Sequence, residues 1–318
     1  MQLNLLHLDN ALLEQPCFMD VCRRVDAKQI NMQDEGRQVR LWATTPQIEK
    51  IRDQLRGLLL GLDTNAPMVT WYGSGDFHHV TAVIVSLLAE RRDAPITIVH
   101  FDNHPDWVRH TGGIHCGSWV HHVLESGLVS RVISIGVSSS DLAWPELKGA
   151  ALDYVASGKL IVFPIDPPAT WVWRCLASGA AHRVDGHRVV WSQFDGVPSP
   201  KKLAALRALI GSDVIYVSID KDVLIGAAAA TNWDQGQLRL DSLIGWLEGL
   251  LTTQSVMGVD VVGDYSPAEL EGCLITRALK RSELLLDQPF ARVTGVAAAA
   301  ANQATNLKLL SVLDTLLC

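Results

Sequence analysis

The sequence around residue 100 runs Ile96-Thr97-Ile98-Val99-His100-Phe101-Asp102-Asn103-His104-Pro105-Asp106. Its first half is a continuous apolar run, which predicts a strand buried on both faces within a parallel sheet. Its second half alternates acidic and imidazole side chains. Residues two apart point to the same face of an extended chain, so Asp102, His104 and Asp106 should project together if the extended geometry continues past the strand. Carboxylates and an imidazole at the mouth of a strand indicate a metal site.

Similar apolar runs recur along the chain, with helical segments between them. The predicted strands are 68–72, 96–101, 132–136, 160–163, 189–191, 214–219 and 256–262. The predicted helices are 45–60, 78–91, 118–125, 201–210 and 240–251, with a closing helix within 290–318. This alternation, without a linker or a repeat, predicts an α/β fold. The expectation is a single doubly wound domain over residues 1–318, with a mainly parallel sheet flanked by helices.

Composition bounds the class of protein. The chain has 318 residues, of which 48% are hydrophobic, enough for a large core. Its formal charge of −7, without a basic cluster, argues against a nucleic-acid partner. No apolar run is long enough for a membrane span, and no signal peptide is visible. The six cysteines lack CxxC spacing, which predicts reduced thiols in a cytoplasmic protein.

Further polar segments follow other predicted strands. Residues 73–79 follow the strand 68–72, and 218–222 end the strand 214–219, with Asp220 and Asp222 two apart. Residues 112–117, which contain His115, follow the Asp/His cluster, and 263–267 end the last strand. Ligands of doubly wound sheets gather beyond the carboxyl ends of the strands, so these segments are predicted to share one site.

The charge of this site calls for metal ions. Asp102, Asp106, Asp220 and Asp222 would repel one another and lose hydration if they were buried together without compensation. Two divalent cations offset four negative charges. An oxygen-rich set with a minority of imidazoles suits Mn²⁺ best, with Zn²⁺, Fe²⁺ and Co²⁺ as alternatives. Two such metals can share a bridging water and convert it to hydroxide near neutral pH.

These segments, in this order, resemble the ureohydrolase family of arginase and agmatinase, within the arginase–deacetylase fold. The resemblance covers residues 68–136 and 213–267. The family's Asp-x-His-x-Asp motif corresponds to residues 102–106, its Ser-x-Asp-x-Asp motif to 218–222, its His-Gly loop to 115–117 and its Gly-Gly-Asp-His motif, loosely, to 75–79. The resemblance implies one metal held by His78 or His79 with Asp102, Asp106 and Asp220. It implies a second held by Asp102, His104, Asp220 and Asp222, and a homo-oligomeric protein.

Two features concern the reaction rather than the metals. His115 is a candidate proton shuttle to the leaving amine, since imidazole titrates near neutral pH. The family places a Glu after the last strand to hold a guanidinium, and here Gly263 stands in that place. Asp264 follows it and is the candidate substrate contact, in a shifted pose.

Three functions follow from these observations. The leading hypothesis is a binuclear metal hydrolase of a C–N bond in a small guanidino-type molecule, with metal-bridging hydroxide as the nucleophile. The second is an amidase or deacetylase of a small acylated amine. The third is a non-catalytic, metal-binding relative that kept the fold.

Overall fold

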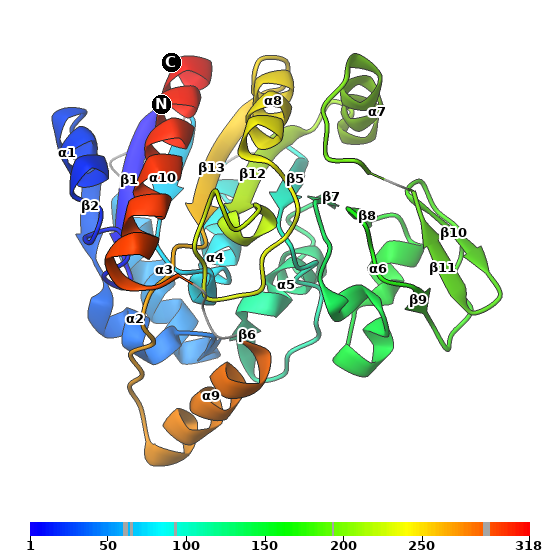
Figure 1. The fold of residues 1–318 in the computed structure, drawn as a ribbon, viewed down its shortest axis with the longest axis horizontal. Coiled ribbons are helices and arrows are strands. Elements are labelled where there is room, and N and C mark those ends of the chain that lie inside the picture. The colour runs from blue at the N-terminus through cyan, green and yellow to red at the C-terminus, as the bar shows by residue number, and fades with distance from the viewer. Residues whose placement is uncertain (60–62, 64–65, 92–93, 193, 289–292) are drawn as a thin grey trace.

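The computed structural model describes residues 1–59, 63, 66–91, 94–192, 194–288 and 293–318. A parallel sheet lies at its centre, and eight of the described strands belong to it (Figure 1). These strands are β1 (Gln2–His7), β2 (Lys28–Asn31), β4 (Met68–Trp71), β5 (Ile96–Phe101), β7 (Arg131–Ile135), β8 (Leu160–Phe163), β12 (Val214–Asp220) and β13 (Val256–Val262). Every pairing within this sheet is parallel, as the continuous apolar runs predict.

The order of the strands creates the switch point at which ligands bind. Across the sheet they run β2-β1-β4-β13-β12-β5-β7-β8. β4 and β5 are consecutive in this sheet along the chain, but two positions separate them in space. These positions are occupied by β13 and β12, which come last in the sequence. In the paired register, Trp71 lies beside Val261, and Phe101 lies beside Ile219. The carboxyl ends of these four central strands consequently meet at one edge, where the polar segments follow.

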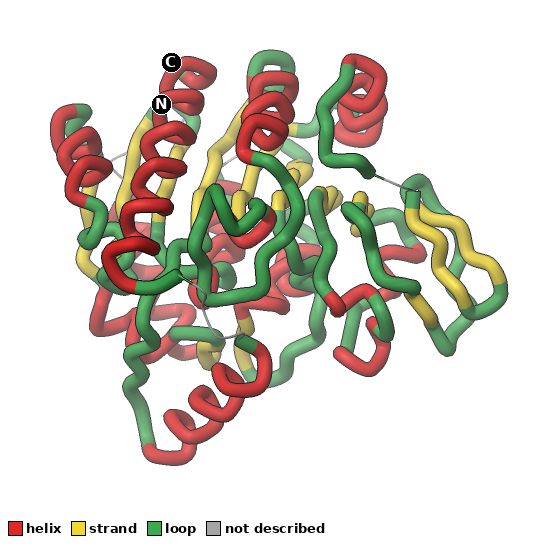
Figure 2. Tube along the Cα trace, in the orientation of Figure 1, coloured by secondary structure: helices red, strands yellow, loops and turns green. Residues whose placement is uncertain are grey.

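Helices cover both faces of the sheet (Figure 2). The described helices are α1 (Pro16–Arg24), α2 (Gln33–Val39), α3 (Thr45–Leu59), α4 (Val80–Ala89), α5 (Trp119–Glu125), α6 (Leu152–Ala156), α7 (Pro200–Ile210), α8 (Leu240–Leu251), α9 (Leu274–Asp287) and α10 (Gly295–Leu317). The pairs α3–α4 and α4–α5 pack together on one side, and α1–α10, α10–α8 and α8–α7 pack on the other. None of these helices is both apolar and long enough to cross a membrane.

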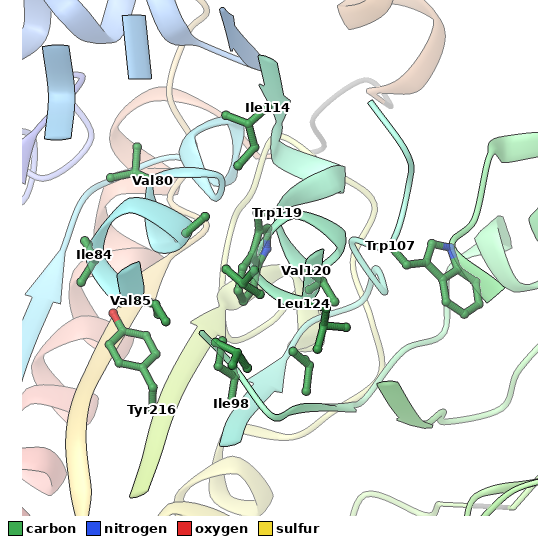
Figure 3. Close-up of a cluster of buried hydrophobic side chains, with 14 of the residues drawn as sticks. Val80, Ile84, Val85, Ile98, Trp107, Ile114, Trp119, Val120, Leu124 and Tyr216 are labelled. Carbon is green, nitrogen blue, oxygen red and sulfur yellow. The ribbon is translucent and has the colours of Figure 1, made fainter. Parts of the chain in front are cut away.

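The two faces carry separate apolar clusters, because successive strand residues point in opposite directions. In β5, Ile98 packs into one cluster and Val99 into the other. Figure 3 shows the first cluster, in which side chains of α4 and α5 lie toward Ile98 of β5 and Tyr216 of β12. The labelled side chains of the two helices are Val80, Ile84, Val85, Trp119, Val120 and Leu124. This packing fixes the helix starts that carry site residues.

Several elements differ from the sequence prediction. Residues 188–191 form β11 (Arg188–Trp191), which is not part of the parallel sheet. It pairs antiparallel with β9 (Thr170–Trp171) and β10 (His182–Asp185) in a separate small sheet. A second small sheet joins β3 (Trp42–Thr44) to β6 (Gly113–His115). The sequence prediction omitted β1, β2 and α9, and the predicted ends at Leu60 and Phe290 lie outside the described residues.

Gly263, immediately after β13, is in a conformation that only glycine adopts easily. Its φ is +93°. A Cβ at this position would lie 2.2 Å from Asp220 Oδ1 and 2.6 Å from the backbone nitrogen of Lys221. A glutamate therefore does not fit here without displacing a site carboxylate and backbone atoms.

We predict that Gly263→Ala destabilises the protein more than Gly158→Ala. Gly158 has a φ of +71° but open space around the Cβ position, so it shares the backbone strain without the steric clash. The strain costs about 1–2 kcal/mol at either position, and the clash should add about 1–3 kcal/mol at Gly263. Urea unfolding of both variants measures the difference, and equal losses would contradict the steric account.

Candidate metal centre

The candidate site lies where the four central strands end. His78 lies between the single-turn 3₁₀ helix Gly75–Phe77 and α4, both of which follow β4. The loop after β5 carries Asp102, His104 and Asp106, while Asp220 closes β12 and Asp222 lies in the turn that follows. The structure thus brings together side chains from distant parts of the chain, through the strand order described above.

The first group of potential metal ligands surrounds His78. Its Nδ1 lies 3.1 Å from Asp102 Oδ2, 3.1 Å from Asp106 Oδ2 and 3.6 Å from Asp220 Oδ2. His100, inside β5, completes this group, with its Nε2 2.8 Å from Asp102 Oδ2. One imidazole nitrogen facing three buried carboxylates is a donor set that fits a divalent cation.

The second group surrounds His104. Its Nδ1 lies 2.8 Å from Asp222 Oδ2 and 3.6 Å from Asp102 Oδ1. Asp102 therefore belongs to both groups and contributes one oxygen to each. Asp220 lies at the edge of the first group, with its Oδ2 3.6 Å from His78 Nδ1. The geometry suits two neighbouring cations that share Asp102, and the roles of these residues as ligands stay predictions.

Asp106 reaches the site by a different route from the predicted one. Extended geometry does not continue past β5, because Asp106 has a φ of +48°. Asp tolerates this left-handed region better than most residues. The turn directs the carboxylate at His78, and the Trp119 indole nitrogen donates to its Oδ2 at 2.6 Å. The shared face that the spacing predicts is thus achieved by a turn rather than by strand alternation.

A row of buried polar side chains beneath the site holds the imidazoles. Thr70, Asp260, Ser218, His100 and Ser134 are neighbours across five adjacent strands. The Ser218 hydroxyl lies 2.8 Å from His78 Nε2 and donates to Asp260 at 2.7 Å. His100 Nδ1 lies 3.1 Å from the Ser134 hydroxyl. Outer partners of this kind fix the ring orientation of metal-binding histidines.

His104 has an outer partner that the sequence prediction missed. Its Nε2 lies 2.9 Å from Asp234 Oδ1, in the loop after β12. Asn103 holds this carboxylate, because its side-chain nitrogen donates to Asp234 Oδ2 at 3.1 Å. The sequence around Trp233 and Asp234 carries no metal-ligand spacing, so only the folded loop reveals the role of Asp234.

The electrostatics of the site show how strongly its charges depend on compensation. Burial raises the pKa of Asp220 to about 7, with a further contribution from Asp102. Burial also holds the pKa of Asp222 well above its usual value. Burial disfavours the charged imidazole of His78, but hydrogen bonds and charges from Asp102 and Asp106 outweigh this and raise its pKa well above the usual value. Protons thus balance the carboxylates when no cation does.

His79 lies apart from both ligand groups. It is fully buried, and neither of its ring nitrogens has a hydrogen-bond partner among the described residues. Burial, with the nearby charges of His115 and Lys280, holds its pKa well below the usual value. The geometry therefore favours His78 as the predicted ligand and places His79 in the core behind it.

The site opens into a cavity of about 560 Å³. His115 lines it, and so does Glu283 of α9, whose Oε1 lies 2.5 Å from His115 Nε2. Three further acidic residues outside the two ligand groups also line the cavity: Asp141, Asp234 and Asp287. No local pattern in the sequence marks Glu283, because its partner His115 lies far away in the chain.

Asp264 does not line this cavity. It is fully buried, forms an ion pair with Lys221, and accepts hydrogen bonds from Gln15 at 3.1 Å and from Asn306 at 3.3 Å. The expected substrate contact of Asp264 is therefore corrected: the carboxylate faces neither the cavity nor solvent. The cause is Lys221, a buried ammonium between Asp220 and Asp222 that needs a counter-charge.

The fold and the cluster define a parallel α/β protein with a candidate metal centre at the carboxyl edge of its sheet. Residues 13–156 match the model of the arginase family, a region that includes His78, Asp102 and His115 but ends before Asp220. An uncharacterized protein of Thermotoga maritima is 26% identical over 202 residues, which is 63% of this chain and 60% of that protein.

Solved structures show the same fold. Entamoeba histolytica arginase in complex with L-ornithine has a TM-score of 0.58 and 14% identity, with 99% of each chain covered. Proclavaminate amidino hydrolase from Streptomyces clavuligerus has a TM-score of 0.56 and 19% identity, covering 90% of this chain and 74% of that one. Bacillus subtilis formimidoylglutamase has a TM-score of 0.56 and 13% identity, covering 97% and 87%. These matches show that the chain shares the fold of these proteins. The match of residues 13–156 to the arginase family agrees with the resemblance drawn from the sequence.

We predict that Asp264→Ala acts on stability. Removing this carboxylate leaves the buried Lys221 ammonium without a counter-ion, which should cost about 3–5 kcal/mol. The double variant Lys221→Met with Asp264→Leu removes both charges and should recover much of the loss. Urea unfolding measures both effects. A variant as stable as the parent protein, with an altered KM, would return Asp264 to the substrate site.

We also predict that divalent metal binding releases protons at pH 7. In the metal-free protein the pKa of Asp220 is raised to about 7, so this carboxyl is partly protonated there. Bound cations require the ionised form, so affinity should rise as the pH rises through 7. Calorimetric titration with Mn²⁺ in buffers of different ionisation enthalpy measures the proton count. A heat that is independent of the buffer would contradict the raised pKa.

Proposed function

We propose that this chain is a binuclear metal-dependent hydrolase of a C–N bond in a small guanidino-type molecule. The observation that carries the proposal is Asp102, whose two oxygens each lie within a separate His/Asp group at the floor of one cavity. Two adjacent cations that share a carboxylate suit the activation of a single water. The similarity to the ureohydrolases supports the reaction class.

Different residues would bind the metals, orient the ligands and transfer a proton. Asp102, Asp106, Asp220, Asp222, His78 and His104 would hold the two cations, with His100 beside the first. When bound, the cations supply Lewis acidity and lower the pKa of water enough to provide a nucleophile near neutral pH. Ser218 and Asp234 orient the imidazoles of His78 and His104. His115 lines the cavity and is the residue that we propose to move a proton toward the leaving nitrogen.

The cavity wall favours a cationic substrate. Asp141, Asp234, Glu283 and Asp287 line it in addition to the ligand groups, whereas Lys148 is the lining lysine and pairs with Asp141 at 2.5 Å. A guanidinium or amidinium group gains from such surroundings, since each charge needs a counter-charge when it leaves water.

A second candidate is the hydrolysis of an amide or acylated amine, and Gly263 favours it. No side chain fits at Gly263, so the usual carboxylate for a guanidinium is absent from the strand end. The remaining parts of the proposal are Mn²⁺ as the metal, a small-molecule substrate, a homo-oligomer, a cytoplasmic location and a single domain over residues 1–318.

The metal content can be tested first. The protein reconstituted with Mn²⁺ should retain close to two ions per chain after gel filtration, as measured by elemental analysis. Asp102→Asn should lose both ions, because it removes the shared carboxylate. The control Asp153→Asn changes an exposed carboxylate that pairs with Arg109 and Arg174 on the surface, and should keep both ions. Tight binding of a single ion in the parent protein would contradict the binuclear site.

The reaction is tested by offering the Mn²⁺-loaded protein guanidino compounds, amidines and acylated amines. Urea, ammonia, free amine and carboxylate are measured together. Urea release, absent in Asp102→Asn, supports the leading proposal. Carboxylate release with free amine supports the second candidate. A two-metal protein that turns over none of these classes would overturn both.

A further inference from the structure

Each ring nitrogen of His115 has a hydrogen-bond partner. Its Nδ1 accepts a hydrogen bond from the Gly117 backbone N–H at 2.9 Å. A nitrogen that accepts cannot carry the ring proton, so in the neutral imidazole that proton lies on Nε2. Nε2 in turn lies in close contact with Glu283 Oε1, so its N–H donates to a carboxylate in a charge-assisted hydrogen bond. Both ring positions are therefore defined by named partners.

Glu283 is itself held in place by the strand opposite His115. Trp42 and His115 are paired residues in the β3–β6 ladder. The Trp42 indole N–H donates to Glu283 Oε2 at 3.1 Å. Trp42 and His115 therefore each contact a different oxygen of the Glu283 carboxylate. The carboxylate is thus aligned by a rigid element rather than by solvent.

The helix that carries Glu283 is fixed at the same place. Lys280, one turn before it on α9, donates to the backbone oxygens of Gln38 and Trp42, each at 2.7 Å. Its ammonium also lies 4.4 Å from the centre of the Trp42 ring. In Figure 1, α9 extends away from the sheet, and these contacts attach its C-terminal half beside β6. α9 therefore presents Glu283 to His115 in a defined position.

We propose that Glu283 is a positioning residue for His115: it accepts the hydrogen bond from Nε2–H and fixes the ring in the cavity wall. The carboxylate comes from α9, whereas the strand end at Gly263 cannot provide one. Proton transfer through this ring, which requires His115 to take up a second proton first, rests on the proposed hydrolase function. The hydrogen bond and its effect on the ring do not depend on it.

The hydrogen bond is tested without any substrate. In the full-length protein with ¹⁵N-labelled histidine, His115 should give a protected, downfield Nε2–H signal, assigned by its loss in His115→Gln. Glu283→Gln removes the negative charge and should move this signal upfield or broaden it by exchange with water. Trp42→Phe keeps the ring over Lys280 but loses the N–H donor, and should produce a smaller change in the same direction.

A matched pair provides the control. His121 and Glu125 are another His–Glu pair, on α5, with His121 Nδ1 3.8 Å from Glu125 Oε2. Glu125→Gln should leave the His115 signal unchanged. An unaltered Nε2–H signal in Glu283→Gln would overturn the proposal, whether or not the protein hydrolyses any compound.

Kinetics then separate positioning from substrate binding, on whichever substrate turns over. Glu283→Gln should lower kcat, up to the about 10²–10⁴-fold expected for losing an acid–base group, with KM nearly unchanged. In a His115→Gln background the same substitution should have no further effect on kcat, because it acts through the missing ring. A rise in KM that persists in that background would identify Glu283 as a substrate contact and overturn the positioning role.

Discussion

The constraint on which this structure depends is the negative charge buried at the carboxyl edge of the sheet. Asp102, Asp106, Asp220 and Asp222 converge there from two adjacent strands. Burial, with repulsion from the Asp102 charge, raises the pKa of the other three carboxyls. The surrounding elements are arranged to compensate. Imidazoles arrive from β5 and from the start of α4, and the Trp119 indole and backbone N–H groups donate the remaining hydrogen bonds.

The same constraint explains features that lie further from the metal centre. Lys221 enters the core between two site carboxylates and requires Asp264 as its partner, which removes Asp264 from the cavity. Gly263 must lack a side chain because the Asp220 carboxylate occupies the space beside it. The cavity therefore receives no carboxylate from this strand end, and α9 contributes Glu283 and Asp287 to its wall.

Sequence alone predicted the central strands and the parallel α/β class, because buried parallel strands read as continuous apolar runs. It also predicted the convergence of residues 102–106 with 220–222, since these motifs end neighbouring strands. It missed His100, which sits inside an apolar run and resembles a core residue. It missed Glu283 and Asp234, whose partners His115 and His104 lie more than a hundred residues away, so no local spacing marks them. It misplaced Asp264 because no local pattern in the sequence shows that Lys221 is buried and pairs with it.

The strand order has a consequence for how the protein acquires its site during synthesis. β12 and β13 are made last but lie between β4 and β5, which are made early. His78 follows β4 and Asp102 follows β5. Until β12 and β13 have been made, the two strands that belong between β4 and β5 are missing. Pairings between such distant segments form slowly, because the loops must close before the contacts stabilise them. The candidate metal centre therefore cannot be complete until β12, which carries Asp220, has been made and has paired with β5.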